Sequence, residues 1–116
     1  MTSIFTRIIA REIPADVVYE DDLVIAFRDI APRAPVHLLV VPKTEAYQDV
    51  VGLAAGDPAL LAHVVATARA LAAEHTGGDF RLVFNTGAGA GQSVFHVHAH
   101  VLGDRAGLSE GSLGDL

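Results

Sequence analysis

The sequence contains no cysteine and no tryptophan, and it has eight basic residues against fourteen acidic ones. Without cysteine, neither a disulfide nor a thiolate metal site can form. The net charge of −6 and the absence of a basic cluster argue against binding along a nucleic-acid backbone. A small nucleotide is still compatible, because backbone N–H groups can bind a phosphate. Lys43 is the only lysine, so an anion site would have to use arginine, histidine or main-chain donors.

Long hydrophobic runs are also missing. No apolar stretch approaches the roughly 20 residues that a membrane helix needs. Residues 1–7 lack the basic, apolar and small-residue regions of a signal peptide. We therefore expect a cytoplasmic protein with no membrane partner. With 116 residues, of which 51% are hydrophobic, the chain is long enough for one domain with its own core.

The hydrophobic spacing predicts one short helix, one long helix and five strands. Ser3 is a candidate N-cap for the short helix, and Asp57 with Pro58 begins the long one, which ends near His75. Strands are expected at 17–19, 23–27, 36–41, 80–85 and 96–102. The short connections favour an α+β fold in which helices cover one face of a five-stranded antiparallel sheet. The domain is expected to span residues 1–103, with a C-terminal tail at 104–116.

Three histidines alternate with apolar residues in the last predicted strand, 96–102. Successive side chains of a strand point to opposite faces, so the apolar residues should face a core. The histidines, His96, His98 and His100, should then line the other face. A solvated strand face is the simplest alternative. Three histidines in register, directly after a glycine-rich loop, argue against it.

A shared metal ion is a second alternative for this row. Neighbours on one face of a strand are about 7 Å apart at the backbone, and positions i and i+4 about 13 Å. Zinc needs each histidine nitrogen at roughly 2 Å. A metal would therefore require a ligand from elsewhere, such as His37, and we expect no metal or other cofactor. For His63 and His75 on the long helix, a surface position and a helix C-terminal position are the simplest interpretations.

Nucleophilic catalysis is the third possibility. A neutral imidazole can attack phosphorus, and neighbouring imidazoles can fix its tautomer or donate protons. The glycine-rich loop 86–93 could bind an oxyanion through its backbone N–H groups. It has neither the P-loop sequence nor the dinucleotide-binding spacing. Asp29 could accept hydrogen bonds from a ribose diol, although taken alone it fits better as a turn residue before Pro32.

Together these residues resemble the histidine triad (HIT) superfamily, and its Hint branch in particular. The pattern His-x-His-x-His, followed by Val101 and Leu102, carries the resemblance. Further blocks occur in the same order with family-like spacing over nearly the whole chain: 4–9, 12–15, 19–22, 26–30, 34–37, 40–43 and 91–94.

This resemblance implies a two-step transfer at an α-phosphorus. His98 would attack and form a nucleotidyl-histidine, which water then hydrolyses. His100 would bind the phosphate or assist protonation, while His96 and His37 would orient the nucleophile. Ser93 would contact the phosphate oxygens. The nucleotide contacts that the resemblance implies are Ile4, Phe5, Phe27, Asp29, Ile30, Leu39, Asn85, Gly91, Gln92, Ser93, Val94, His98 and His100.

The implied activity is hydrolysis of purine nucleoside phosphoramidates by a homodimer, whose two sheets join through the region 57–84. A dinucleoside polyphosphate hydrolase is the nearest alternative, and a nucleotide-binding regulator with incidental hydrolysis is an alternative of another class. Two features depart from the family pattern. The tail lacks the tryptophan of animal Hint proteins, and Glu45 replaces the histidine of a Lys-x-His block that many members carry.

Overall fold

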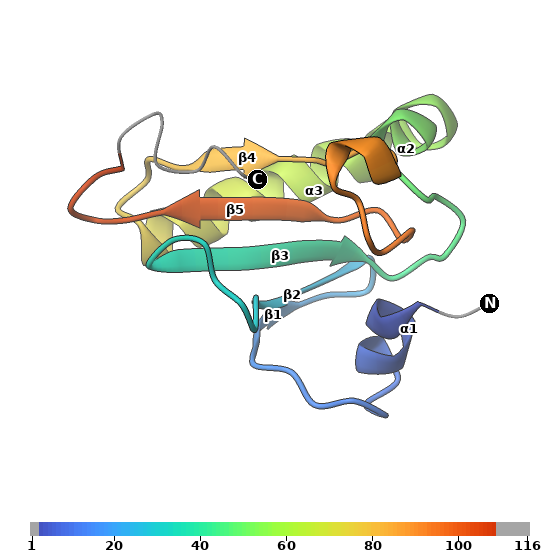
Figure 1. The fold of residues 1–116 in the computed structure, drawn as a ribbon, viewed down its shortest axis with the longest axis horizontal. Coiled ribbons are helices and arrows are strands. Elements are labelled where there is room, and N and C mark those ends of the chain that lie inside the picture. The colour runs from blue at the N-terminus through green and yellow to red at the C-terminus, as the bar shows by residue number, and fades with distance from the viewer. Residues whose placement is uncertain (1–2, 109–116) are drawn as a thin grey trace.

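The computed structural model describes residues 3–108. Figure 1 shows a five-stranded antiparallel sheet in the order β1-β2-β3-β5-β4. The elements, in chain order, are α1 (Ile4–Ile9), β1 (Val17–Glu20), β2 (Val24–Arg28), β3 (Val36–Pro42), α2 (Val50–Gly56), α3 (Pro58–His75), β4 (Arg81–Val83), the 3₁₀ turn η1 (Ala88–Ala90) and β5 (Ala99–Gly103). The predicted α+β class and five-stranded sheet are confirmed.

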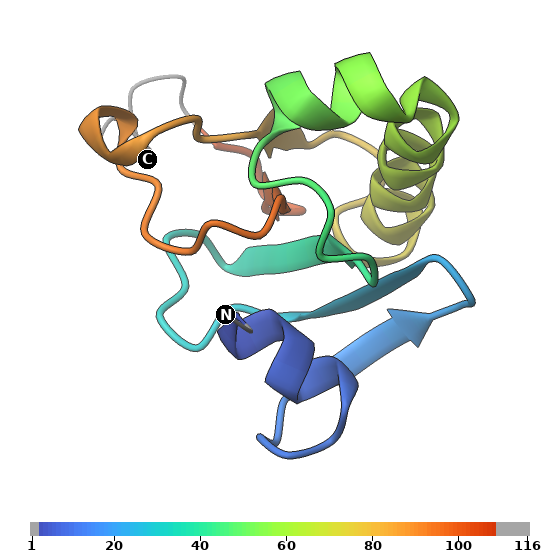
Figure 2. The ribbon, with the colours of Figure 1, turned by 90° about the vertical axis from the view of Figure 1, so that its right-hand side faces the viewer.

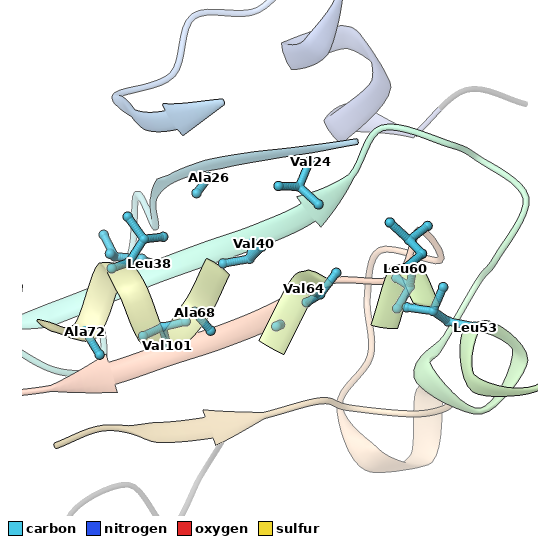
Figure 3. Packing of buried hydrophobic residues seen from close by; sticks show 13 residues of the cluster. Val24, Ala26, Leu38, Val40, Leu53, Leu60, Val64, Ala68, Ala72 and Val101 are labelled. Atoms are coloured by element: carbon cyan, nitrogen blue, oxygen red, sulfur yellow. The ribbon is translucent and has the colours of Figure 1, made fainter. Parts of the chain in front are cut away.

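One face of the sheet packs against α2 and α3. Figure 3 shows Leu60, Val64, Ala68 and Ala72 of α3 meeting strand residues, with Leu53 of α2 beside them. The strand side chains of this core are fully buried and alternate along the chain: Val24, Ala26, Leu38, Val40, Ala99 and Val101. Val97, just before β5, joins the same core. The expectation that the apolar residues between the histidines face a core is therefore confirmed.

The other face of the sheet is divided into an apolar and a polar part. Phe5 and Ile8 of α1 cover the apolar part, which is formed by Ile25, Phe27, Leu39 and Val41. Figure 2 shows α1 on the opposite side of the sheet from α2 and α3. The prediction that helices cover one face only is thus wrong. The amphipathic spacing of α1 predicts which of its own residues are buried, but it does not predict on which face of the sheet the helix packs.

Three further differences concern element bounds. The helix α2 was not predicted, because Val50–Gly56 contains two glycines and β-branched residues that disfavour helix in isolation. It forms where the Asp49 side chain accepts a hydrogen bond from the N–H of Gly52 at 2.9 Å. The strands β4 and β5 are shorter than the predicted 80–85 and 96–102. His96 and His98 therefore lie on the segment that enters β5 rather than inside the ladder.

The register brings the last strand and the third strand together at the site. His37 of β3 lies opposite Leu102, and Leu39 lies opposite His100 of β5. His37 and His100 are consequently diagonal neighbours on one face, although 63 positions separate them in the sequence. Among residues 3–108 no helix combines the length and the apolar character needed to cross a membrane.

Candidate active site

The histidines project from the polar part of the sheet face that α1 partly covers. His96 and His100 are buried, and His98 is partly exposed. The ring centroids of His98 and His100 are 5.1 Å apart, and those of His37 and His100 are 5.2 Å apart. The structure therefore places His37 beside the histidine row. From the sequence, His37 is the candidate that could join this row from another strand.

His98 has one ring nitrogen committed to the protein. Its Nδ1 lies 2.8 Å from the main-chain carbonyl oxygen of His96, which can only accept a hydrogen bond. Nδ1 therefore carries the proton, and Nε2 keeps a free lone pair. Burial lowers the pKa of His98, and the neighbouring His96 lowers it further, against the opposing effects of the hydrogen bond to His96 and the charge of Asp29. The neutral, nucleophilic form is thus favoured at neutral pH.

His96 is held at both ring nitrogens. Nε2 lies 2.7 Å from the carbonyl oxygen of Pro42, and Nδ1 lies 2.7 Å from the hydroxyl of Ser3. The ring of Phe5 packs edge-on against both His96 and His98, with the His98 centroid at 4.9 Å. His96 is buried, and it supports His98 through its main-chain carbonyl group rather than by facing the cavity.

His37 and His100 form a hydrogen-bonded pair. The backbone N–H of Arg33 donates to His37 Nδ1 at 3.0 Å, so Nδ1 is an acceptor and Nε2 carries the proton. His37 Nε2 is 2.9 Å from His100 Nδ1 and can donate to it. The neutral His100 then has its proton on Nε2, where it can serve as a donor to an anion.

The pKa values of this pair follow from the same surroundings. Burial lowers the pKa of His37, with the Asp29 charge raising it and the Arg33 charge lowering it. Burial lowers the pKa of His100 to about 4, and the neighbouring His98 and His37 contribute in the same direction. Both rings are therefore neutral at pH 7.

Asp29, His37 and His100 place three potential metal ligands within 4.8 Å of one another. The contact between Asp29 Oδ2 and His37 Nε2 is 3.4 Å. The surroundings of His37 do not fit a bound metal, because a metal-bound imidazole usually donates its other N–H to an acceptor. His37 Nδ1 instead faces the N–H of Arg33. The arrangement suits a hydrogen-bonded pair of neutral histidines better than a metal centre.

A cavity of about 460 Å³ opens beside these histidines. The site residues that the sequence predicted and that line it are Asp29, His37, Asn85, Gly91, Ser93, His98 and His100. Ala31, Arg33 and Ala90 also line it and were not predicted. A signal for Arg33 was its place between two prolines in the loop before His37, where a side chain is held near the site.

The predicted base-contacting residues separate into two groups. Phe5, Phe27 and Leu39 pack together in the apolar cluster under α1, with Val94 against it. The rings of Phe5 and Phe27 are 5.7 Å apart. Ile4 is 46% exposed and Ile30 is 96% exposed, so neither is needed for the core. Phe5, Phe27 and Leu39 are at most 6% exposed, and Phe5 reaches the cavity residues through its ring contact with His98.

Gln92 is buried and directs all of its hydrogen bonds to main-chain groups. Its Oε1 accepts from the N–H of Gly87 at 2.8 Å, and its Nε2 donates to the carbonyls of Gln48 and Val94 at 2.6 and 3.1 Å. It thereby closes the glycine-rich loop on itself. The loop also needs left-handed backbone at Gly87 and Gly91, with φ of 87° and 92°, which glycine adopts without strain.

The geometry describes a histidine-centred site on one face of an antiparallel sheet, with a loop suited to an oxyanion. The HIT domain model matches residues 10–107. The chain belongs to the HIT family.

Three relatives illustrate the match. An uncharacterised HIT-like protein of Synechococcus elongatus is 52% identical over 106 residues, which cover 90% of this chain and 91% of that protein. The purine nucleoside phosphoramidase of Escherichia coli is 42% identical over 105 residues, covering 89% of this chain and 87% of that protein. A solved HIT family hydrolase from Clostridium thermocellum superimposes with a TM-score of 0.84 at 38% identity, covering 95% of this chain and 94% of that one.

Proposed function

We propose that this protein hydrolyses the P–N bond of purine nucleoside 5′-phosphoramidates through a covalent nucleotidyl-histidine. The observation that carries the proposal is the His98 ring, whose Nδ1 is bonded to the His96 carbonyl while its Nε2 is left free beside the cavity. The 42% identity to a purine nucleoside phosphoramidase supports the choice of substrate class.

In the first step, Nε2 of His98 forms a bond to the α-phosphorus, and the bond from phosphorus to the leaving nitrogen breaks. The leaving nitrogen takes up one proton from solvent water and departs as the neutral amine. The cationic imidazole that forms keeps its Nδ1–H on the His96 carbonyl, which stabilises the positive charge. In the second step, water attacks phosphorus, the P–Nε2 bond breaks, and the attacking water releases one proton to solvent. Nucleoside monophosphate is released and His98 is restored.

The remaining residues have supporting roles in this proposal. The Nε2–H of His100 donates to a phosphate oxygen, and His37 fixes the His100 tautomer that makes this possible. Ser93, Asn85 and the N–H groups near Gly91 bind the phosphate from the other side of the cavity.

Around the nucleoside, Asp29 binds the ribose hydroxyls. The base lies against the exposed side chains of Ile4 and Ile30, at the edge of the buried apolar cluster of Phe5, Phe27 and Leu39 against which Val94 packs. Gln92 contributes by holding the loop in shape.

The decisive experiment compares adenosine 5′-phosphoramidate with a diadenosine polyphosphate as substrates. We expect AMP release from the phosphoramidate to be much faster, and to be lost in His98→Ala. Mass spectrometry of rapidly quenched enzyme should find one adenylyl group on His98. Faster turnover of the polyphosphate would favour the alternative hydrolase. Tight AMP binding without turnover of either compound would favour a regulator.

The quaternary structure is part of the same proposal. The short strand β4 lies at one edge of the sheet, next to α3, on whose surface Val65 is 40% exposed. Two protomers joined through α3 and β4 would continue the sheet into a second copy. Light scattering coupled to gel filtration should give a mass of about two chains, and a monomer at micromolar concentration would contradict this proposal. The cytoplasmic location stays a prediction.

A further inference from the structure

A hydrogen bond joins the first turn of α1 to the histidine row across 93 positions of sequence. The hydroxyl oxygen of Ser3 is 2.7 Å from His96 Nδ1. The same oxygen accepts the backbone N–H of Thr6 at 3.1 Å and thereby caps α1. Ser3 therefore has two partners for one hydroxyl group, and the direction of each bond can be worked out.

The neighbouring groups determine where the Ser3 proton goes. The Pro42 carbonyl can only accept, so neutral His96 carries its proton on Nε2 and offers Nδ1 as an acceptor. The other oxygen near Ser3 belongs to Thr6, at the longer distance of 3.4 Å. Thr6 uses its own proton on the carboxylate of Glu45, at 2.8 Å. The consistent assignment is that Ser3 donates to His96.

This bond bears directly on the nucleophile. His96 is 2% exposed, so removing the Ser3 hydroxyl takes from a buried ring nitrogen the donor that it now has. Between Ser3 and Pro42 the imidazole is held at both ends, and the main-chain carbonyl of the same residue accepts the Nδ1–H of His98. A change in the position of His96 would therefore move its main-chain carbonyl, which fixes the His98 tautomer.

We propose that Ser3 is a positioning residue for the nucleophile His98, acting through His96. The inference rests on the proposed function and deepens it. The start of α1 would then position the nucleophile in two ways, because Phe5 of this helix also packs against the His98 ring. Glu45 accepts the Thr6 hydroxyl proton at 2.8 Å, which leaves the Ser3 hydroxyl free to donate to His96.

The test separates the hydroxyl from the cap. Ser3→Gly removes the hydroxyl but costs only a few tenths of a kcal/mol as an N-cap, and Ser3→Thr keeps both functions. We expect Ser3→Gly to lower kcat for adenosine phosphoramidate about tenfold, the effect of about one hydrogen bond to a buried group, with KM within about twofold. Ser3→Thr should restore kcat.

The control is Asp57→Ala, which removes the cap of α3, a hydrogen bond from Leu60 N–H at 3.1 Å. This variant should lose stability and keep kcat. A rise in KM without a fall in kcat for Ser3→Gly would show that the bond only docks α1, and would overturn the proposal.

A second readout needs no substrate. The ¹⁵N shifts of the His98 ring should report a single Nδ1–H tautomer in the wild type and in Ser3→Thr, and a mixture in Ser3→Gly. Unchanged ring shifts in Ser3→Gly would overturn the positioning role. If the wild type fails to turn over phosphoramidates, the proposed function falls, while the ring shifts still decide the role of Ser3.

Discussion

Each of the four site histidines has one ring nitrogen bonded to a fixed protein group. Main-chain groups fill this role for three of them: the Pro42 carbonyl for His96, the His96 carbonyl for His98 and the Arg33 N–H for His37. His100 is held in turn by His37. This arrangement sets all four tautomers without a tightly bonded carboxylate, and it leaves Nε2 of His98 as an acceptor and Nε2 of His100 as a donor.

The acid limb of the pH profile should reflect this environment. Because burial lowers the pKa of His98, its Nε2 stays unprotonated when the pH falls below the ordinary histidine value of about 6.5. We expect kcat/KM for adenosine phosphoramidate to fall on the acid side with a midpoint below the ordinary histidine value of about 6.5. Initial rates at low substrate concentration from pH 4 to 8 measure the midpoint. A midpoint at or above 6.5 would contradict the assigned surroundings of His98.

At the level of elements, the glycine-rich loop is held in shape by one of its own side chains, in addition to its glycines. Gln92 supplies one acceptor and two donated bonds to three separate stretches of backbone. We expect Gln92→Glu to raise KM severalfold, because a carboxylate can accept from Gly87 but would face the carbonyls of Gln48 and Val94. Steady-state kinetics measure the change.

Gln48→Ala is the matched control for the loop, since only the main chain of Gln48 takes part in the contact. It should leave KM unchanged. Equal effects of the two substitutions would show that the loop is disturbed by something other than the Gln92 bonds.

A second link between elements joins the β1–β2 turn to α3. His63 Nε2 lies 2.7 Å from Asp21 Oδ2, and Tyr19 donates to the same oxygen. Burial would raise the pKa of Asp21, but hydrogen bonds from Tyr19, the N–H groups of Leu23 and Val24, and His63 lower it overall. From the sequence, His63 is interpreted as a surface residue. In the structure it also links α3 to the β1–β2 turn.

We expect His63→Ala to lower the free energy of unfolding by about 1 kcal/mol, the typical net contribution of one hydrogen bond. His75→Ala is the control, because its Nε2 is 3.9 Å from the exposed carboxylate of Glu74. Urea unfolding at pH 7 measures both variants. A larger loss for His75→Ala would contradict the link.

For the whole molecule, three site histidines with lowered pKa values make stability depend on pH. The unfolded chain binds protons at about pH 6.5, whereas His37, His98 and His100 resist protonation when folded. Stability should therefore be fully present above about pH 6.5 and should decline as the pH falls toward 4, because the unfolded state takes up more protons.

Thermal unfolding between pH 7.5 and 4 should show this decline in the wild type. The double variant His37→Gln, His100→Gln, which removes two of the three titrating groups, should show a shallower one. An equal slope in both proteins would mean that other groups govern the acid response.

The sequence predicted what depends on local periodicity. Alternation placed Val97, Ala99 and Val101 in the core, and capping signals placed the starts of α1 and α3. It did not predict contacts between distant positions. The bond between Ser3 and His96 and the contact between His96 and Pro42 join residues 93 and 54 positions apart, and only the folded sheet brings them together.

The two faces of the sheet have a consequence for how this chain tolerates change. Along the stretch 96–101, every second side chain lies in the α3 core, and the others are the histidines. A saturation library of these six positions should therefore alternate in its failures. Substitutions at the valines and the alanine should reduce the amount of folded protein, whereas those at His98 and His100 should chiefly reduce turnover by protein that still folds. Adjacent positions in this stretch therefore differ in what a mutation impairs: one position affects stability and the next affects the reaction.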